Sequence, residues 1–312
     1  MTRRAAEFPG RFLDRCRAMV PDFEPFIDSM SRPPRRTVRV NTIKANREQV
    51  LGWLRNLDPQ PLDWWENALA LGQPGVGKRL EHFLGLVYVQ EAASMVPPLV
   101  LGAEPGETVL DLCAAPGSKT TQLAAMMENT GLVVANDYSQ ARLRGLVGNV
   151  DRAGCLNVVI TRMDGVALVR NWPGSCDRVL VDAPCTCEGT VRRSARVLDQ
   201  WSLDAIARFS QLQKGLAVAG YHALKPGGTM VYSTCTLAPE ENEEVVDYLA
   251  RRFPEAELLP VELPGFRMRQ PLAEWNGRRF ATGVANCRRI LPQDNDTEAF
   301  FLALIRRPIE AR

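Results

Sequence analysis

The chain has 312 residues, of which 46% are hydrophobic, and its formal net charge at pH 7 is +2. This length suits one large domain or two modest ones, and so small a net charge excludes a protein that is strongly basic throughout. Basic residues are nevertheless concentrated in the stretch 32–44, which has no acidic residue, and such a patch can bind phosphates. The N-terminus lacks an apolar signal region and no apolar run could span a bilayer, so we expect a cytoplasmic protein without membrane association.

The chain has eight cysteines and only two histidines. In a reducing cytosol we expect these thiols to be free. No CxxC pair occurs, and the spacing Cys185-Thr-Cys187 is a poor zinc signature without further paired ligands. The sequence therefore predicts no metal site, and it argues against a nucleophilic triad based on histidine.

The first hundred residues mix helices and strands. Apolar residues at helical spacing predict short helices within residues 1–30. Residues 58–85 are mixed and rich in turns. The other elements expected here are a strand at 37–43, an amphipathic helix at 46–57 with Asn46 as its N-cap, a strand at 86–90 and a helix within 91–102.

From residue 108 onward, strands and helices alternate. This alternation predicts an α/β fold with a doubly wound, mostly parallel sheet. The stretch 103–107 is the best boundary, and it divides the chain into residues 1–103 and residues 104–312. The expected strands are 108–112, 131–137, 157–161, 177–183, 228–234 and a last, edge-like strand at 298–307; the expected helices are 118–128, 139–154, 203–223 and 239–252.

The stretch TVLDLCAAPGSKT, residues 108–120, predicts a cofactor loop. Small residues in the turn, Gly117 among them, let a ligand approach the backbone, and Ser118 can cap a helix whose N-terminus offers unpaired N–H groups. Asp137 ends the next strand, where a doubly wound fold places an acid on a ribose. The GxGxxG and P-loop patterns are both absent, so we expect a nucleoside-type cofactor other than NAD. Asp164 follows the third strand, and its place at an adenine edge stays open.

Two cysteines follow apolar runs in similar polar turns, Cys185 after 177–183 and Cys235 after 228–234. Each alone is more typical of a core residue. The carboxyl ends of parallel strands meet at one edge of a sheet, so we expect the two thiols to converge there with the strand-end carboxylates. These carboxylates are Asp111, Asp137, Asp164 and Asp182.

Four segments carry a family resemblance: DLCAAPGSKT, NDYSQAR, VDAPCTCEGTVRR and LKPGGTMVYSTCTLAPEEN. In this order they resemble the Nop/Sun (RsmB/NOP-type) family of S-adenosylmethionine-dependent RNA cytosine-C5 methyltransferases. The blocks at 38–44 and 88–97 agree, and the likeness covers residues 10 to 305. Among subgroups it is closest to the bacterial 16S rRNA methyltransferases of the RsmF kind. Where the family has DAPCSG this chain has DAPCTC, so Thr186 and Cys187 replace serine and glycine.

The resemblance implies a seven-stranded Rossmann-like class I methyltransferase domain with a smaller α+β N-terminal region that binds RNA. It also implies S-adenosylmethionine as the cofactor. Cys235 would be the nucleophile and Cys185 the second catalytic cysteine, which serves product release. The cofactor would be lined by Cys113, Ala114, Ala115, Pro116, Gly117, Ser118 and Lys119, with Asp137 on the ribose, Arg142 near Asp137, Asp164 on the adenine side, and Asp182 at the methionine end or the base.

The chemistry of cytosine explains a pair of cysteines. C5 is too poor a nucleophile to attack a methyl sulfonium, but a thiolate that adds at C6 makes C5 enamine-like. A helix that starts near Pro239 would favour the Cys235 thiolate through its dipole. A second group must take the C5 proton before the thiolate leaves, and Asp182 could hold the N3/N4 edge of the base. The target base must be unstacked to enter such a site.

The function expected from the sequence is RNA cytosine-C5 methylation by a monomer, with 16S rRNA as the first choice of substrate and tRNA as the second. The basic stretch 32–44 would hold phosphates, with residues 192–196 near the substrate strand. Three other classes stay open: a DNA cytosine-C5 methyltransferase, an RNA-binding assembly factor with a decayed site, and a nicotinamide dehydrogenase. The presence of Cys235 argues against the first, and intact cofactor and cysteine motifs argue against the second.

Overall fold

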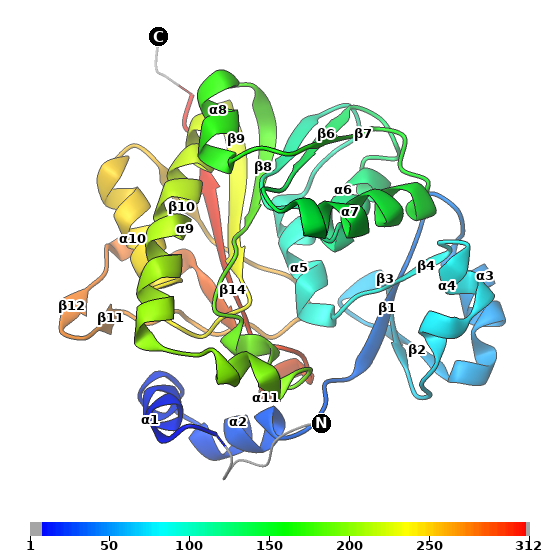
Figure 1. Cartoon of the computed structure of the whole chain (residues 1–312), viewed down its shortest axis with the longest axis horizontal. Helices are drawn as coiled ribbons and strands as arrows, with labels where there is room; N and C mark the ends of the chain where they lie inside the picture. Colours follow the sequence, from blue (N-terminus) through cyan, green and yellow to red (C-terminus); the bar gives the residue numbers. More distant parts are fainter. Residues whose placement is uncertain (1–7, 310–312) are drawn as a thin grey trace.

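A computed structural model describes residues 8–309, and it places a small N-terminal sheet beside a larger α/β domain (Figure 1). Two short helices come first, α1 (Gly10–Met19) and α2 (Phe23–Met30), as the apolar spacing predicts; residues 1–7 lie outside the described part. The buried faces of these helices pack on the larger domain, against residues such as Leu237 and Leu291. The two helices therefore share a hydrophobic core with segments that follow strands of the main sheet.

The small sheet is antiparallel, with strand order β2-β3-β1-β4. Its strands are β1 (Arg36–Val40), β2 (Pro59–Leu62), β3 (Trp65–Leu71) and β4 (Val87–Val89). Strands β2 and β3 lie within residues 58–85, where the sequence predicts turns. The pattern hides them because β2 contains two prolines and the last residues of β3 are buried on both faces. Helix α3 (Arg47–Trp53) begins at a capping box formed by Asn46 and Gln49, and the expected N-cap is confirmed. The short helix α4 (Leu80–Phe83) precedes β4.

The main sheet has the order β10-β14-β9-β8-β5-β6-β7, with β13 paired to β14. The strands from β7 to β9 in this order are parallel, and β14 runs antiparallel to β9. The sheet thus has eight strands where the resemblance implies seven, and β14 lies inside the sheet rather than at its edge. The strands are β5 (Thr108–Asp111), β6 (Leu132–Asn136), β7 (Val158–Thr161), β8 (Cys176–Asp182), β9 (Leu224–Thr234), β10 (Glu257–Leu259), β13 (Arg288–Ile290) and β14 (Phe300–Arg306).

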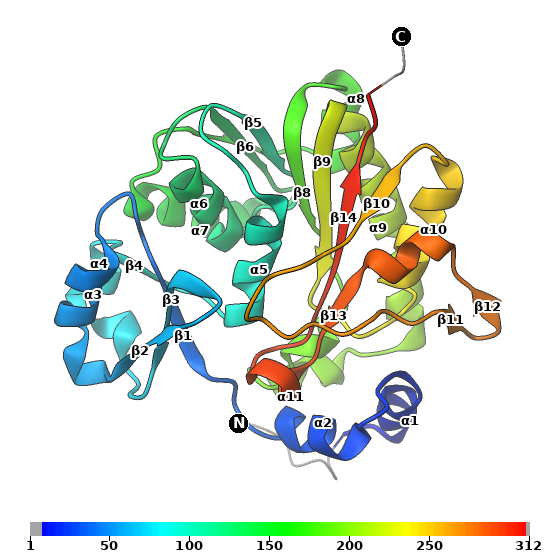
Figure 2. The same cartoon turned by 180° about the vertical axis from the view of Figure 1, so that it is seen from behind.

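Helices cover both faces of this sheet, which confirms the doubly wound fold. One face carries α5 (Ala92–Leu101), α6 (Ser118–Met126) and α7 (Gln140–Ala153), seen from behind in Figure 2. The other carries α8 (Gly165–Asn171), α9 (Leu203–Ala223) and α10 (Glu243–Arg252). A small hairpin of β11 (Glu274–Trp275) and β12 (Arg278–Arg279) and a short helix, α11 (Pro292–Asn295), complete the C-terminal region. The division of the chain at residues 103 and 104 stays a prediction.

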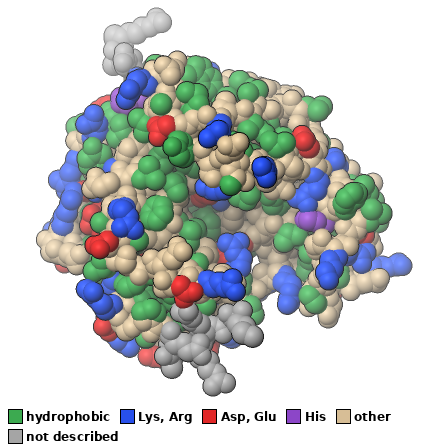
Figure 3. Space-filling model, in the orientation of Figure 1, with side chains coloured by type: hydrophobic (Ala, Val, Ile, Leu, Met, Phe, Trp, Pro, Cys, Tyr) green, Lys and Arg blue, Asp and Glu red, His purple; other side chains and the backbone are tan. Residues whose placement is uncertain are grey.

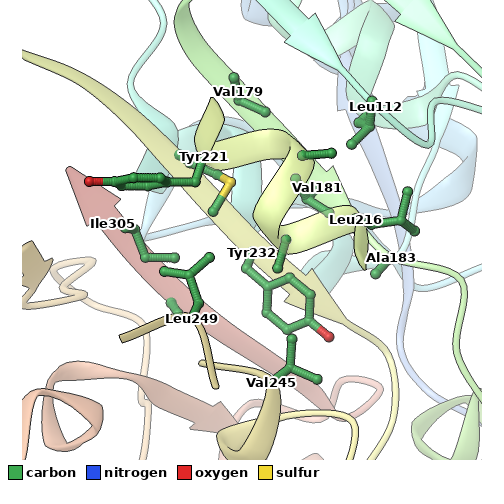
Figure 4. Packing of buried hydrophobic residues seen from close by; sticks show 14 of the residues in the cluster. Leu112, Val179, Val181, Ala183, Leu216, Tyr221, Tyr232, Val245, Leu249 and Ile305 are labelled. Carbon is green, nitrogen blue, oxygen red and sulfur yellow. The ribbon is translucent and has the colours of Figure 1, made fainter. Parts of the chain in front are cut away.

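The largest hydrophobic cluster lies between β8, β9 and β14 and the helices α9 and α10 (Figure 4). Val179 and Val181 of β8 and Tyr232 of β9 are fully buried in it. The Tyr232 hydroxyl donates a hydrogen bond of 2.6 Å to the Glu241 carbonyl. This packing fixes the carboxyl ends of β8 and β9, from which both cysteine turns depart.

A buried arginine joins the small sheet to the larger domain. The Arg39 side chain lies in β1 and is 1% exposed. Its guanidinium donates to Gln90 Oε1 at 2.9 Å and to Thr121 Oγ1 of α6 at 2.8 Å, and burial lowers the pKa of Arg39 to about 10. The helix that follows the predicted cofactor loop is therefore held directly by the N-terminal sheet.

Among residues 8–309, no helix combines the length and the apolar character needed to cross a membrane.

Candidate active site

A cavity of about 340 Å³ opens where the carboxyl ends of β5, β8 and β9 face the connection from β4 to α5. Strand ends and the first turns of the following helices supply its wall, which is where parallel-sheet proteins place ligands. Most of the residues that the sequence singles out reach it. Those that line it are Cys113, Ala114, Ala115, Pro116, Ser118, Lys119, Arg142, Asp182 and Cys235.

The cofactor loop turns through Gly117, whose φ is +101°. A side chain there would be strained, and its Cβ would lie 2.8 Å from Leu146 of α7. Gly117 does not line the cavity, so the left-handed turn and the close approach of α7 account for this glycine. Gly117 is also the N-cap of α6, and no side chain caps that helix. The expectation that Ser118 caps it is wrong, because Ser118 is already the first helical residue.

Asp137 lies directly behind the loop. Its carboxylate accepts hydrogen bonds from the backbone N–H groups of Ala115 at 3.2 Å and Ser139 at 2.9 Å. The Arg142 guanidinium lies 3.5 Å from the same carboxylate and also donates to the Ala115 carbonyl. The structure thus brings Asp137 and Arg142 together. Asp137 is buried beneath the cavity wall, and its contact with a ribose stays a prediction.

Asp164 lies elsewhere. It is exposed, it precedes α8, and its Oδ1 accepts the Ala167 N–H at 3.0 Å as an N-cap. The cavity described above does not include it. Its placement on the adenine side therefore stays a prediction, and capping is the contact that the structure shows.

Asp111 is the strongest indication of a ligand that the chain itself does not supply. Its Oδ2 accepts the Thr120 hydroxyl at 2.7 Å, whereas its buried Oδ1 has no hydrogen-bond partner in the described chain. Burial raises the pKa of Asp111 to about 7, and the charges of Asp182 and Asp137 act in the same direction. A buried carboxyl oxygen without a partner is costly, and this one lies in the cavity wall. A cationic amino group, such as that of a bound amino acid, fits there.

Asp182 ends β8 and is the hub of the polar contacts in the cavity. Its Oδ2 lies 2.7 Å from Lys119 Nζ, and its Oδ1 accepts the Ser233 hydroxyl at 2.8 Å. The Lys119 ammonium also donates to Ser94 Oγ at 3.0 Å and lies 5.3 Å from the centre of the Phe300 ring. One ion pair thus connects the cofactor loop to the strand that leads to Cys185.

The two cysteine turns meet. Cys185 Sγ lies 3.4 Å from Cys235 Sγ and 3.9 Å from Cys187 Sγ. The expected convergence of the first two thiols is confirmed, although their catalytic roles stay predictions. Cys185 is buried, and Cys187 and Cys235 are half-buried. The sequence assigns no role to the third thiol, that of Cys187. Its only sign in the sequence is the motif DAPCTC, where the family has DAPCSG.

The three thiols titrate together. Hydrogen bonding with Cys185 and Cys235 lowers the pKa of Cys187 to about 3, and the positive charges of Arg193 and Arg142 contribute. The same contacts and burial raise the pKa of Cys185. For Cys235, the hydrogen bond with Cys185 lowers the pKa, but Cys187, burial and the charge of Asp182 outweigh it and raise the pKa overall.

The helix expected to assist Cys235 begins too late in the chain. Helix α10 starts at Glu243 rather than near Pro239, because residues 239–242 form turns. The N-cap of α10, Asn242, nevertheless contacts Thr234 and Thr236, on either side of Cys235. The expected start near Pro239 is therefore wrong, and the dipole contribution to the Cys235 thiolate stays a prediction.

A buried polar network supports both turns from below. The Thr186 hydroxyl lies 2.8 Å from the Thr236 hydroxyl, and the Thr186 N–H donates to Glu241 at 3.0 Å. Burial raises the pKa of Glu241 to about 7.

The Gly189 N–H donates to the Cys235 carbonyl at 2.9 Å, and a Cβ at Gly189 would lie 2.8 Å from that oxygen and 2.4 Å from the Ala299 carbonyl. This glycine is required by the close approach of two backbones.

Only part of the predicted RNA surface is available. Arg39 is buried, Lys44 donates to the carbonyls of Leu84 and Arg152, and the Arg192 side chain is 2% exposed and is held by the Thr297 carbonyl and Asp296. The expectation that the basic stretch holds phosphates is therefore wrong for Arg39, and Arg192 is likewise committed inside the protein, whereas Lys44 stays exposed. Exposed arginines of the two basic segments include Arg35, Arg36, Arg193 and Arg196.

These arginines lead toward the cavity. A groove of about 480 Å³ is lined by Pro34, Arg35, Arg36 and Arg193 among others, and Arg193 also lines the cavity that Cys235 reaches. Figure 3 shows basic side chains around the hollow between the small sheet and the main domain. The groove and the cavity therefore lie on either side of a shared residue, Arg193.

Several residues of the cavity were missed by the sequence reasoning. They come from two segments, β4 to α5 and the start of β14, and they include Tyr88, Gln90, Glu91, Ser94, Glu298 and Phe300. Burial raises the pKa of Glu298 to about 8, and Glu91 adds to this effect. The available signals were the family block at 88–97 and the predicted strand at 298–307, but spacing along the chain says nothing of how these segments pack.

Two family models match the chain in succession. The one described as 16S rRNA methyltransferase RsmB/F matches residues 98–306, and the one described as the N-terminal domain of 16S rRNA methyltransferase RsmF matches residues 8–92. Together they cover both parts of the fold and confirm the resemblance seen in the sequence.

Curated relatives fall into two kinds. A tRNA (cytosine(49)-C(5))-methyltransferase of Pyrococcus abyssi is 43% identical, over 92% of this chain and 93% of that protein. A ribosomal RNA small subunit methyltransferase F of Klebsiella pneumoniae is 39% identical, over 98% of this chain but only 65% of that protein. The chain thus spans less than two thirds of the length of the latter.

Solved structures agree on the fold. A methyltransferase homologue from Pyrococcus horikoshii has a TM-score of 0.85 at 34% identity, with 96% of each chain covered. The structure of NSun6 from the same organism has a TM-score of 0.84 at 22% identity, over 96% of this chain and 98% of that one. The second likeness concerns the fold alone.

Proposed function

Because the chain belongs to the family of 16S rRNA methyltransferases RsmB/F, we propose that it transfers a methyl group from S-adenosylmethionine to C5 of a cytidine in RNA. The observation that carries this proposal is the 3.4 Å contact between Cys185 Sγ and Cys235 Sγ beside the cavity. A nucleophile and a second acid–base group within reach of one reacting base are what C5 methylation requires.

Cys235 is the proposed nucleophile because its side chain lines the cavity, whereas that of Cys185 does not. Its thiolate adds to C6 of the cytosine, and C5 becomes nucleophilic. This step requires that the proton of Cys235 leave first. The 3.4 and 3.9 Å sulfur contacts offer Cys185 and Cys187 as a route for that proton.

Cys185 serves the second half of the reaction. After methyl transfer the C5 proton must leave before the bond between Cys235 and C6 can break. Cys185 lies against Cys235. Once its own proton has been lost to solvent, its thiolate takes the C5 proton directly or through water, the C5–C6 double bond forms again, and Cys235 leaves as a thiolate. Asp182 is placed to hold the N3/N4 edge of the base, with Lys119 and Ser233 fixing its carboxylate.

The residues around the cavity fit S-adenosylmethionine, which supplies an electrophilic methyl group when bound. The unpartnered Oδ1 of Asp111 suits its cationic amino group. The small residues Ala114 and Ala115 leave room at the wall, and Asp137 lies behind them with Arg142. We assign the ribose to Asp137 and the adenine side to Asp164, as the family motif implies.

Ribosomal RNA of the small subunit is the proposed substrate, because both family models describe enzymes of that kind. A tRNA is the second candidate. It is favoured by the P. abyssi relative, which matches over 93% of its own length. Either RNA would follow the arginine-lined groove, with its target base unstacked into the cavity.

The test is a denaturing gel of the protein after incubation with total RNA and S-adenosylmethionine. We expect Cys185→Ala to accumulate a covalent RNA adduct, because release is blocked, and Cys235→Ala and the double variant to form none. Sequencing the trapped RNA then names the substrate. An adduct that survives the loss of Cys235 would overturn the assignment of the nucleophile, and trapping by neither single variant would overturn the proposed reaction.

A further inference from the structure

The sulfur atoms of Cys185, Cys187 and Cys235 all lie within 4.8 Å of one another. Two of the three separations are 3.4 and 3.9 Å. The sequence offers only the pair Cys185-Thr-Cys187, and the fold supplies the third thiol from a turn about fifty residues later. Three thiols converge on one point, which neither turn could achieve alone.

This spacing fits a single metal ion. A Zn–S bond of about 2.3 Å in tetrahedral geometry places neighbouring sulfur atoms about 3.8 Å apart, close to the separations observed. Thiolates are the ligands that zinc and other soft cations prefer. Among the described residues no histidine or carboxylate joins the group, so the fourth position would be left to water.

The thiols are held in place and can be reached. Cys187 has a φ of +59°, and its carbonyl accepts the backbone N–H of Thr190 at 2.9 Å. The Gly189 N–H ties this turn to the Cys235 carbonyl. Cys235 faces the catalytic cavity, while Cys185 and Cys187 line a second cavity of about 580 Å³ together with Arg196 and Trp201. The cluster therefore lies between two openings, and an ion has an entry path from either.

We infer that Cys185, Cys187 and Cys235 form a binding site for one thiophilic divalent cation, with Zn²⁺ as the representative ion. Binding requires all three sulfur atoms as thiolates, so whatever protons the cluster still holds are released to solvent. Because the ion takes the sulfur of Cys235, the loaded protein cannot attack a base. This inhibition rests on the proposed function, whereas the binding itself does not.

The experiment titrates reduced, oxygen-free protein with Cd²⁺, whose thiolate charge-transfer absorbance reports sulfur ligands directly, and then displaces Cd²⁺ with Zn²⁺. The variants are Cys187→Gly, Cys235→Ala and, as the matched control, Cys155→Ser, a half-buried cysteine outside the cluster. Glycine suits position 187 because the backbone there is left-handed. Circular dichroism checks that each variant is folded.

We expect saturation at one Cd²⁺ per chain for the parent and for Cys155→Ser. Loss of one ligand in Cys187→Gly or Cys235→Ala should weaken binding at least about 100-fold, since even the hydrogen-bond partners of metal ligands contribute about 10- to 100-fold. A parent without the absorbance band, or a folded Cys187→Gly with unchanged affinity, would overturn the inference.

A second readout connects the site to catalysis. Methyl transfer by the parent should fall as Zn²⁺ reaches one equivalent and return with a chelator, and the ratio of rates with and without Zn²⁺ should be near one for Cys187→Gly. If no methyl transfer is found at all, the proposed function fails while the absorbance titration still decides the metal site. If Zn²⁺ binds to the cluster and the rate is unchanged, the inhibitory role is wrong.

Discussion

Lys119 Nζ lies 2.7 Å from Asp182 Oδ2, although 63 residues separate the two in the chain. Lys119 belongs to the first turn of α6, which follows β5, and Asp182 ends the neighbouring strand β8. The ion pair therefore connects the two segments at the carboxyl ends of these strands. The Lys119 side chain is only 8% exposed, which makes the pair far less screened than a surface salt bridge. Positioning of Asp182 should therefore depend on Lys119.

Replacing Lys119 with glutamine should leave Asp182 without its cation. We expect kcat/KM for methyl transfer to fall about 30- to 100-fold, equivalent to about 2–3 kcal/mol, measured with saturating RNA and varied S-adenosylmethionine. Lys225→Gln is the matched control, because Lys225 pairs with Asp177 at the opposite end of β8. That pair is partly exposed and lies away from the cavity, so it should matter little. Equal losses in both variants would show that the effect is on folding rather than on the cavity.

Gly189→Ala should disrupt the contact between the two cysteine turns. Its Cβ would lie 2.4 Å from the Ala299 carbonyl and 2.8 Å from the Cys235 carbonyl, so one backbone must move. We expect stability to fall by about 1–3 kcal/mol and methyl transfer by more than tenfold. Gly148→Ala, in open space on α7, should instead raise stability by about 0.5–1 kcal/mol. Urea unfolding of the two variants compares them directly, and a fully active Gly189→Ala would contradict the steric argument.

The buried Glu241 should make stability depend on pH. Its pKa is raised from 4.5 to about 7, so the folded state binds the proton more tightly than the unfolded state does. The resulting stabilisation is complete below pH 4.5 and is lost as the pH rises through about 7, by up to about 3 kcal/mol. Glu241→Gln cannot titrate, so the difference between parent and variant should change over this window. Urea unfolding at a series of pH values measures it, and parallel curves would refute the assignment.

Arg39 and Arg36 lie in the same strand but should act differently. Arg39→Ala removes a buried guanidinium together with its bonds to Gln90 and Thr121, and we expect a loss of about 3 kcal/mol in stability. Arg36 is exposed in the groove, so Arg36→Ala should change stability by less than about 0.5 kcal/mol. It should instead weaken RNA binding and reduce the slope of log K against log salt by roughly 0.7–0.9. The opposite pattern would exclude the groove as the RNA path.

The parts of the fold that were predictable from sequence are those with a strong local signal. Strands β5 to β9 are apolar runs that alternate with helices, and α9 was expected at its observed bounds. The sequence pattern does not predict three short elements, namely strands β10 and β13 and helix α8, because few residues form them. Strand β3 went unnoticed because burial on both faces of its end removes the alternation that marks a half-buried strand.

The site divides in the same way. The convergence of Cys185 and Cys235 followed from the rule that parallel strands end at one edge. The third thiol of Cys187 and the unpartnered Oδ1 of Asp111 depend on turn geometry and on packing. The burial of Arg39 and Arg192 likewise depends on which segments meet in space, so a basic stretch in the sequence overstated the basic surface.

The place of β14 in the sheet has a consequence for the order in which the protein matures. Residues 300–306 pair with β9 on one side and with β10 and β13 on the other, so the interior of the sheet includes a strand that is synthesised well after β9. Until it arrives, β9 presents an open, apolar edge immediately before the Cys235 turn. Such edges favour aggregation and slow folding. The turn that carries Cys235 follows β9 directly, so it gains its neighbouring strand only after residues 300–306 have been synthesised.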